Sequence, residues 1–283
     1  MSGSSEGLSN RREFLRRATA AGAALAAGSL INSCAPDSPI GVSPGLPGDA
    51  LRNGILAARN PLRIPPTVSP SALTLSAAQG TADLGGGQLT SAHLYNALLP
   101  GPTIRVNTGD AAAIAFQNGL TESSTVHWHG MIVPSASDGH PLQAVGPGSS
   151  YAYSFPIVQR AATNWYHPHP HMNTARQINL GLAGFFIVND AQEAALNLPS
   201  GAYELPLVLR DALVDANGQL TTGPGTMVLL ANGVRDATVN VDTARYRLRI
   251  LNASAWRVFN LSLSNGRPLH LIGNDGGLIR SRT

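Results

Sequence analysis

Apolar and polar residues alternate in several short runs along this chain, and no segment beyond the N-terminal leader repeats with a helical period of any length. Alternation of this kind predicts half-buried β-strands, because successive side chains of a strand point to opposite faces. The runs that show it are residues 103–106, 112–116, 151–155, 185–188, 246–251 and 259–263. The 30 glycines and 20 prolines suit the turns between short strands. The pattern predicts an all-β protein.

The length of the chain divides into sandwich-sized units. An antiparallel β-sandwich takes roughly 100 residues. Residues 64–190 fit one complete Greek-key sandwich, and residues 191–203, rich in Ala, Asn and Pro, fit a linker. A second sandwich would then begin at residue 204 and still be incomplete at residue 283. We therefore expect one complete domain and one truncated domain.

Five of the eight histidines lie in two tight clusters. His127 and His129 form the first, and His167, His169 and His171 form the second. On extended backbone each cluster projects its imidazoles from one face. Imidazole suits zinc, copper, iron and nickel, and Cu(II) has the highest affinity in the Irving–Williams order. The clusters favour a copper site, although histidines on a solvated strand or packed in a core are the alternative.

Both clusters belong to segments that resemble a known family. The matching segments are residues 100–110 (PGPTIRVNTGD), 118–130 (NGLTESSTVHWHG), 138–139 (DG), 165–171 (WYHPHPH) and 176–190 (RQINLGLAGFFIVND). They resemble the N-terminal cupredoxin domain of the multicopper oxidases, the family of laccases, bilirubin oxidase and the bacterial cuprous oxidases. The resemblance extends from about residue 73 to the end of the chain, so it includes part of a second cupredoxin domain.

The resemblance implies a ligand set for copper. In that family the first histidine of the His-Trp-His-Gly motif binds the type 2 copper, which here is His127. The second binds a type 3 copper, which here is His129. His167 and His169 match the next two type 3 ligands. His171 extends the pattern but is not assigned as a ligand.

Asp138 is the candidate catalytic residue. The family uses an acidic residue shortly after the His-Trp-His-Gly motif to deliver protons to oxygen, and Asp138 matches it. Asp138 also precedes Gly139, and an Asp-Gly pair is typical of a turn. The sequence alone leaves both interpretations open.

The family reaction is the one-electron oxidation of a phenolic substrate or Cu(I), coupled to the four-electron reduction of O2 to water at a trinuclear copper cluster. The family takes further cluster ligands from a His-x-x-His-x-His motif, and its type 1 copper from a His-Cys-His segment, neither of which occurs in this sequence. The one cysteine is Cys34, near the N-terminus, and His270 lies in an alternating run that predicts packing. We expect a truncated chain that is inactive alone.

Two other functions compete with this one, and a third is excluded. A non-catalytic periplasmic copper-binding or cupredoxin-like scaffold would keep the fold and lose the redox chain. A two-domain copper nitrite reductase is excluded, because its first domain needs a type 1 cysteine. A zinc hydrolase would use three histidines and an open water position, but the motif offers no nearby glutamate as a general base.

The N-terminus resembles an export signal. Residues 10–16 (NRREFLR) resemble the twin-arginine motif, and a small-residue apolar stretch follows at 18–31. Residues 30–34 resemble a bacterial lipobox that ends at Cys34, a possible lipid anchor. Residues 35–63 contain a Pro/Ser/Gly-rich tether. These features predict export by the twin-arginine machinery to the periplasm or cell envelope.

Charge adds one exclusion. The formal net charge is +3, only 12% of residues are charged, and no basic cluster marks a surface for nucleic acid. The charge thus argues against nucleic acid as a partner, and the family resemblance implies O2 and a small reducing substrate.

Overall fold

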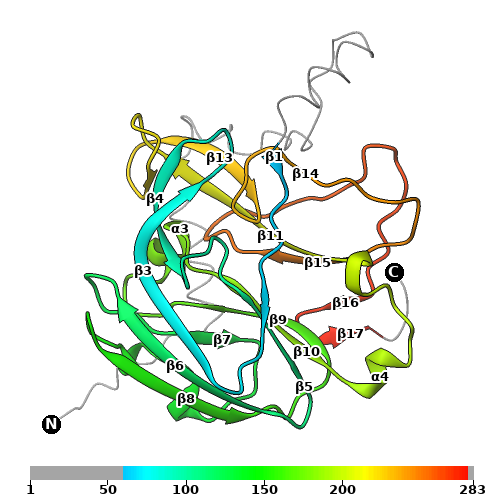
Figure 1. Ribbon diagram of the computed structural model, residues 1–283, viewed down its shortest axis with the longest axis horizontal. Coiled ribbons are helices and arrows are strands. Elements are labelled where there is room, and N and C mark those ends of the chain that lie inside the picture. Colours follow the sequence, from blue (N-terminus) through cyan, green and yellow to red (C-terminus); the bar gives the residue numbers. More distant parts are fainter. Residues whose placement is uncertain (1–59, 280–283) are drawn as a thin grey trace, which may run out of the picture.

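The computed structural model describes residues 60–279, and most of the regular structure in that range is β-strand (Figure 1). The first half folds as two sheets packed face to face. The five-stranded sheet contains, in spatial order, β2 (Thr67–Val68), β5 (Thr103–Asn107), β10 (Gly184–Asn189), β9 (Ala162–His167) and β7 (His127–His129). The four-stranded sheet contains β4 (Leu89–Tyr95), β3 (Leu73–Asp83), β6 (Ala111–Gly119) and β8 (Ser150–Pro156). The predicted all-β class is confirmed.

Strand β6 shows how the sequence pattern becomes a sheet face. Its residues alternate without exception between exposed and buried. Ala112, Ile114 and Phe116 point inward, where burial of apolar area stabilises the sandwich. The core between the two sheets is dominated by aromatic side chains, namely Phe116, Trp128, Tyr153, Phe155, Tyr166 and Phe186.

The second half forms a sheet that lies against the first sandwich. Strand β11 (Glu204–Val214) pairs with the other three strands, which are β12 (Leu220–Thr221), β13 (Thr226–Ala231) and β15 (Arg247–Asn252). A small apolar cluster joins the two halves, with Phe185 and Ile187 of β10 on one side and Val208 of β11 on the other. This contact covers part of the outer face of the five-stranded sheet, the face that also carries the metal-binding candidates.

Short elements complete the described chain. Two pairs of two-residue strands occur: β1 (Asn60–Pro61) with β14 (Ala237–Thr238), and β16 (Gly273–Asn274) with β17 (Gly277–Leu278). The helical elements are α3 (Thr174–Asn179), α4 (Ala191–Ala194), and the 3₁₀ turns η2 (Ser135–Ser137), η3 (Pro141–Gln143) and η4 (Gly201–Tyr203). None has more than six residues, too few for a helical period to be visible in the sequence. Within residues 60–279 no helix is long and apolar enough to span a bilayer.

Two sequence expectations for the second half are wrong. Residues 259–263 alternate but form no strand. His270 was expected to pack, yet it is exposed. Alternation shows only that a segment can present an apolar face, and a strand also needs a neighbour that accepts its backbone hydrogen bonds. The predicted export signal, Cys34 and most of the predicted tether lie outside the described residues.

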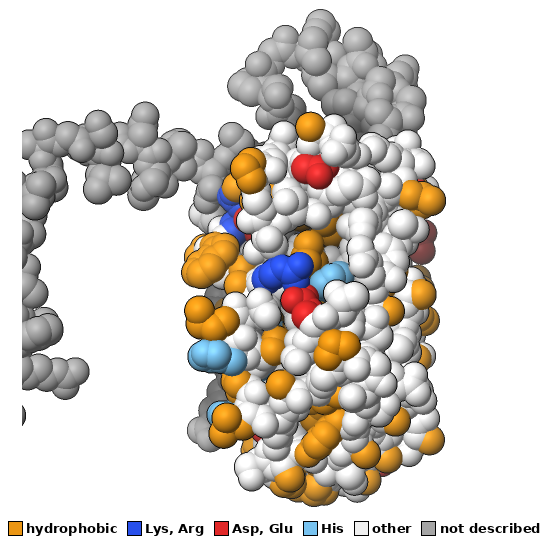
Figure 2. Space-filling model, turned by 90° about the vertical axis from the view of Figure 1, so that its left-hand side faces the viewer, with side chains coloured by type: hydrophobic (Ala, Val, Ile, Leu, Met, Phe, Trp, Pro, Cys, Tyr) orange, Lys and Arg blue, Asp and Glu red, His pale blue; other side chains and the backbone are white. Residues whose placement is uncertain are grey.

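The surface shows the low charge of the chain. On the face in Figure 2, charged side chains are few, and most of the surface is uncharged polar or apolar. Four ion pairs lie instead at the junction of the two halves, where Glu193 and Glu204 meet Arg247 and Arg249.

Candidate metal centre

Pairing of β7 with β9 brings the two histidine clusters together. The strands are antiparallel, with His127 opposite His167 and His129 opposite Trp165. Directly opposite residues in such a pair present their side chains on the same face. The rings of His127 and His167 accordingly lie 5.3 Å apart between centroids. Trp128, between the two histidines of β7, points the other way and is fully buried in the sandwich core.

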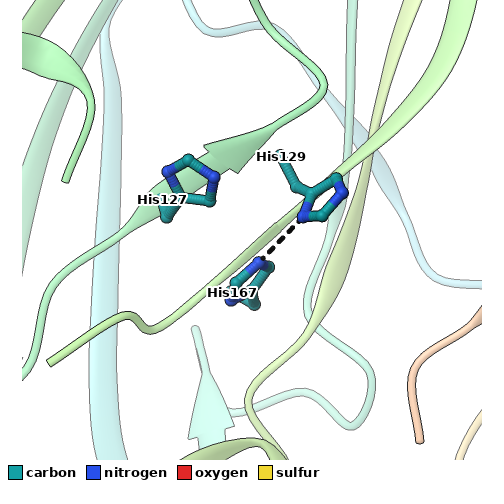
Figure 3. A group of neighbouring side chains, drawn as sticks. All are labelled: His127, His129 and His167. Atoms are coloured by element: carbon teal, nitrogen blue, oxygen red, sulfur yellow. Dashed lines mark hydrogen bonds between the residues drawn. The ribbon is translucent and has the colours of Figure 1, made fainter. Parts of the chain in front are cut away.

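Three imidazoles converge closely enough to share an ion. One ring nitrogen of each of His127, His129 and His167 lies within 4.8 Å of the others. His129 Nδ1 and His167 Nε2 are 3.3 Å apart, the contact drawn as a dashed line in Figure 3. In the metal-free protein one of these nitrogens donates to the other. A metal ion that bound both would replace that hydrogen bond.

Backbone carbonyls orient two of the rings. His127 Nδ1 is 2.8 Å from the carbonyl oxygen of Asp138, and His167 Nδ1 is 2.9 Å from that of Pro168. A carbonyl can only accept, so each Nδ1 carries the proton and each Nε2 keeps its lone pair. Hydrogen bonds of this kind fix the tautomer of a metal-binding histidine. His127 and His167 are thus arranged to bind through Nε2.

Burial favours the neutral form of two of the imidazoles, those of His129 and His167. Burial lowers the pKa of His167 to about 3. Burial also lowers the pKa of His129, and the neighbouring His127 lowers it further. A protonated imidazole has no lone pair to give, so a lowered pKa keeps the ligand atom available in neutral and mildly acidic solution.

His169 lies beside this group but is held differently. Its backbone N–H donates to Thr125 Oγ1 at 2.8 Å, and its ring centroid lies 5.3 Å from that of His127 and 6.1 Å from that of His167. Its Nδ1 is buried with no hydrogen-bond partner among the described residues. Strand β9 ends at His167, so His169 and His171 lie beyond it, and His171 is exposed in a turn.

Asp138 approaches His127 with its side chain as well as its backbone. Its Oδ1 lies 3.4 Å from His127 Nδ1, and the residue ends the turn η2. Gly139 follows with φ +70°, and a Cβ there would lie 1.9 Å from the carbonyl oxygen of Val126. Asp138 is therefore both a turn residue and a neighbour of a candidate ligand, because the Asp-Gly turn packs directly on the strand that carries His127.

The sequence did not reveal two residues that support this site. Thr125 fixes the backbone of His169, and Trp165 lies against the ring of His167, with 4.1 Å between centroids. In the sequence Trp165 appears only as part of the family motif, and nothing in the pattern around Thr125 indicates a role in the site. Their roles depend on which strands become neighbours.

Comparison with known proteins places this arrangement in a family. The family model described as multicopper oxidase matches residues 76–193, the segment that holds all four candidate ligands. The multicopper oxidase mco of Staphylococcus aureus is 36% identical over 212 residues, which are 72% of this chain and 47% of the relative. The chain belongs to the multicopper oxidase family over this matched part.

Solved structures agree with that assignment. A bacterial laccase-like multicopper oxidase, CueO, from Ochrobactrum sp. superposes with a TM-score of 0.74 at 33% identity, over 79% of this chain and 53% of that one. A laccase from Pediococcus acidilactici gives the same TM-score and identity, over 80% and 52%. The expected cupredoxin-like architecture is confirmed.

Another relative has a different name. The cell division protein FtsP of Proteus mirabilis is 33% identical over 286 residues, 96% of this chain and 56% of that protein. The chain thus spans about half the length of the curated relatives it matches.

The residues present fit copper, the metal that the family implies. His127 and His167 each keep a lone pair on Nε2, and His129 faces His167 through Nδ1. With the buried, unpartnered Nδ1 of His169 they form a borderline-soft nitrogen donor set, which suits copper.

Proposed function

We propose that this chain supplies half of the ligands of a trinuclear copper cluster at which O2 is reduced to water. His127 would hold the type 2 copper, and His129, His167 and His169 would hold the type 3 pair. The observation that carries the proposal is the convergence of three ring nitrogens within 4.8 Å across β7 and β9. Copper, when bound, supplies the one-electron redox steps that imidazole and carboxylate groups cannot perform.

The protein's own groups have distinct tasks in this proposal. The carbonyls of Asp138 and Pro168 present His127 and His167 in the right tautomer. The Asp138 carboxylate, whose Oδ1 lies 3.4 Å from His127 Nδ1, would deliver protons to the cluster. The electrons would come from a phenol-like substrate or Cu(I) through a type 1 copper. Residues 60–279 offer no thiolate ligand for that copper, since the one cysteine of the sequence is Cys34.

Copper stoichiometry tests the ligand assignment. The double variant His127→Ala with His169→Ala should take up no specific copper after dialysis, while a His270→Ala control, changed at an exposed histidine, should bind as the wild type does. Unchanged stoichiometry in the double variant would overturn the assignment. Preference for zinc over copper in the same measurement would favour a hydrolytic site instead.

Absorption spectroscopy tests the expectation that these residues form no type 1 copper site. The 283-residue protein loaded with copper should show no intense blue thiolate-to-copper band and no oxidase turnover, because it lacks the type 1 thiolate with its histidines. A blue protein would contradict this expectation.

The similarity to FtsP supports a second candidate, a non-catalytic envelope scaffold, because that match extends over 96% of this chain. The two candidates differ in their need for metal. A scaffold should keep its fold and binding partners in the His127→Ala, His169→Ala variant, whereas the cluster proposed above should lose its specific copper. Export through a twin-arginine signal, with or without lipid attachment at Cys34, belongs to both proposals and is tested by locating the protein after Arg11→Lys with Arg12→Lys.

A further inference from the structure

The β16–β17 hairpin brings a carboxylate from the second half of the chain to the metal centre. Gly273 pairs with Leu278, and Asn274 with Gly277, which leaves Asp275 and Gly276 in the turn. Gly276 N donates to Asn274 Oδ1 at 2.9 Å and so fixes the turn. Both strands contact β9, the strand that ends in His167.

A glycine allows the hairpin to approach β9 closely. Gly277 has φ +106°, a conformation that L-residues rarely adopt. A Cβ at this position would lie 2.9 Å from the carbonyl oxygen of Ala161, just before β9 begins. Any residue larger than glycine at position 277 would therefore push the hairpin away from β9. Backbone packing between the hairpin and β9 thus positions the turn.

A cavity of about 260 Å³ connects the hairpin with His129. It lies between β9, β15 and the hairpin, and His129, Trp165 and Asp275 are all in its wall. The carboxylate of Asp275 and the imidazole of His129 therefore belong to the wall of one shared space.

The other charged side chains of this wall form ion pairs with one another or with Glu204. Arg247 and Arg249 line the cavity together with Glu193, and both arginines form ion pairs with that glutamate. Arg249 Nε also lies 3.1 Å from Glu204 Oε1. These arginines already have carboxylate partners, so Asp275 provides a negative charge on the wall shared with His129.

We propose that Asp275 is an electrostatic positioning residue of the metal centre, whose carboxylate draws a copper ion to His129 across this cavity and stabilises the positive charge there. The proposal rests on the copper function proposed above. Opposite charges attract across a partly solvated gap, and dissolved salt weakens that attraction. The metal centre would then depend on both halves of the chain.

The test measures Cu(II) affinity by competition with a chelator at low and high salt. Asp275→Asn keeps the shape and removes the charge, and we expect roughly three- to tenfold weaker binding at low salt, with a smaller difference at high salt. Asp275→Glu should bind like the wild type. Asp242→Asn removes the same charge from an exposed residue outside the cavity wall and should change nothing.

A second variant separates charge from placement. Gly277→Ala keeps Asp275 but displaces the hairpin, so it should also weaken Cu(II) binding. The double variant Asp275→Asn with Gly277→Ala should lose less binding free energy than the two single variants lose together. Wild-type affinity in Asp275→Asn at both salt concentrations would overturn this proposal alone. A wild-type chain that binds no copper would overturn the proposed function as well.

Discussion

The two His-x-His pairs have the same spacing in the sequence but are held in different ways. His127 and His129 lie within strand β7, and the residue between them, Trp128, is anchored in the aromatic core. His167 ends its strand, and His169 lies beyond it, attached through its backbone to Thr125. The sheet fixes both residues of the first pair, whereas in the second pair it fixes only His167, and the Thr125 hydroxyl holds the backbone of His169.

This difference indicates where each half of the site is vulnerable. A ligand on a strand is positioned by ladder hydrogen bonds and by the opposite face of the same strand, so its geometry shares the stability of the core. A ligand past a strand end depends on local hydrogen bonds, so it can be lost without unfolding the domain. Changes at the first pair should therefore have the largest effect on stability, and changes at the second should have a smaller effect on stability together with a loss of copper affinity.

The largest expected effect is at the anchor of the first pair. Trp128→Ala removes a fully buried ring that contacts Tyr153, Phe155 and Phe186. We expect the free energy of unfolding to fall by roughly 3–5 kcal/mol, measured by chemical denaturation. Trp256, 84% exposed, provides the control, because Trp256→Ala should change little. Equal losses in both variants would contradict the anchoring role.

The turn that packs on His127 should come next. Gly139→Ala places a Cβ 1.9 Å from the Val126 carbonyl oxygen, at φ +70°. We expect a loss of roughly 1–3 kcal/mol in unfolding free energy together with weaker copper binding. Gly148 has φ +71° with nothing near its Cβ position. Gly148→Ala thus reports backbone strain alone, and the difference between the two variants measures the clash.

The second pair should respond to the loss of one hydroxyl. Thr125→Val leaves the His169 N–H without its acceptor, which costs roughly 1–3 kcal/mol for a buried group. Copper affinity should fall as well, because His169 is no longer held in place. Titration with a copper chelator and a denaturation curve measure both effects. Thr125→Ser retains the hydroxyl and should preserve affinity; a serine variant as weak as valine would show that the bond is not responsible.

The smallest effect is expected at His171. It continues the alternating His-Pro run, yet it is exposed beyond the ligands. His171→Ala should change the unfolding free energy by less than about 0.5 kcal/mol and leave copper stoichiometry unchanged, while His169→Ala should reduce it. Loss of copper in His171→Ala would make His171 a ligand and remove the distinction between the two pairs.

The sequence alone determined the β-class, four of the nine strands of the first sandwich, and which histidines to examine as a group. Strict alternation, as in residues 112–116, specifies which side of a strand is apolar, and the family motifs specify which histidines to examine. The same reasoning was wrong for residues 259–263 and for His270, because alternation carries no information about the neighbouring strand.

Only the tertiary structure decided how the site is assembled. The pairing of β7 with β9 sets His127 opposite His167, and it joins residues about forty positions apart. The carbonyls of Asp138 and Pro168 then choose the tautomers, and the β16–β17 hairpin brings Asp275 to the cavity shared with His129. These relations arise from strand pairing and close packing of distant segments, and a linear pattern does not encode distances across a fold.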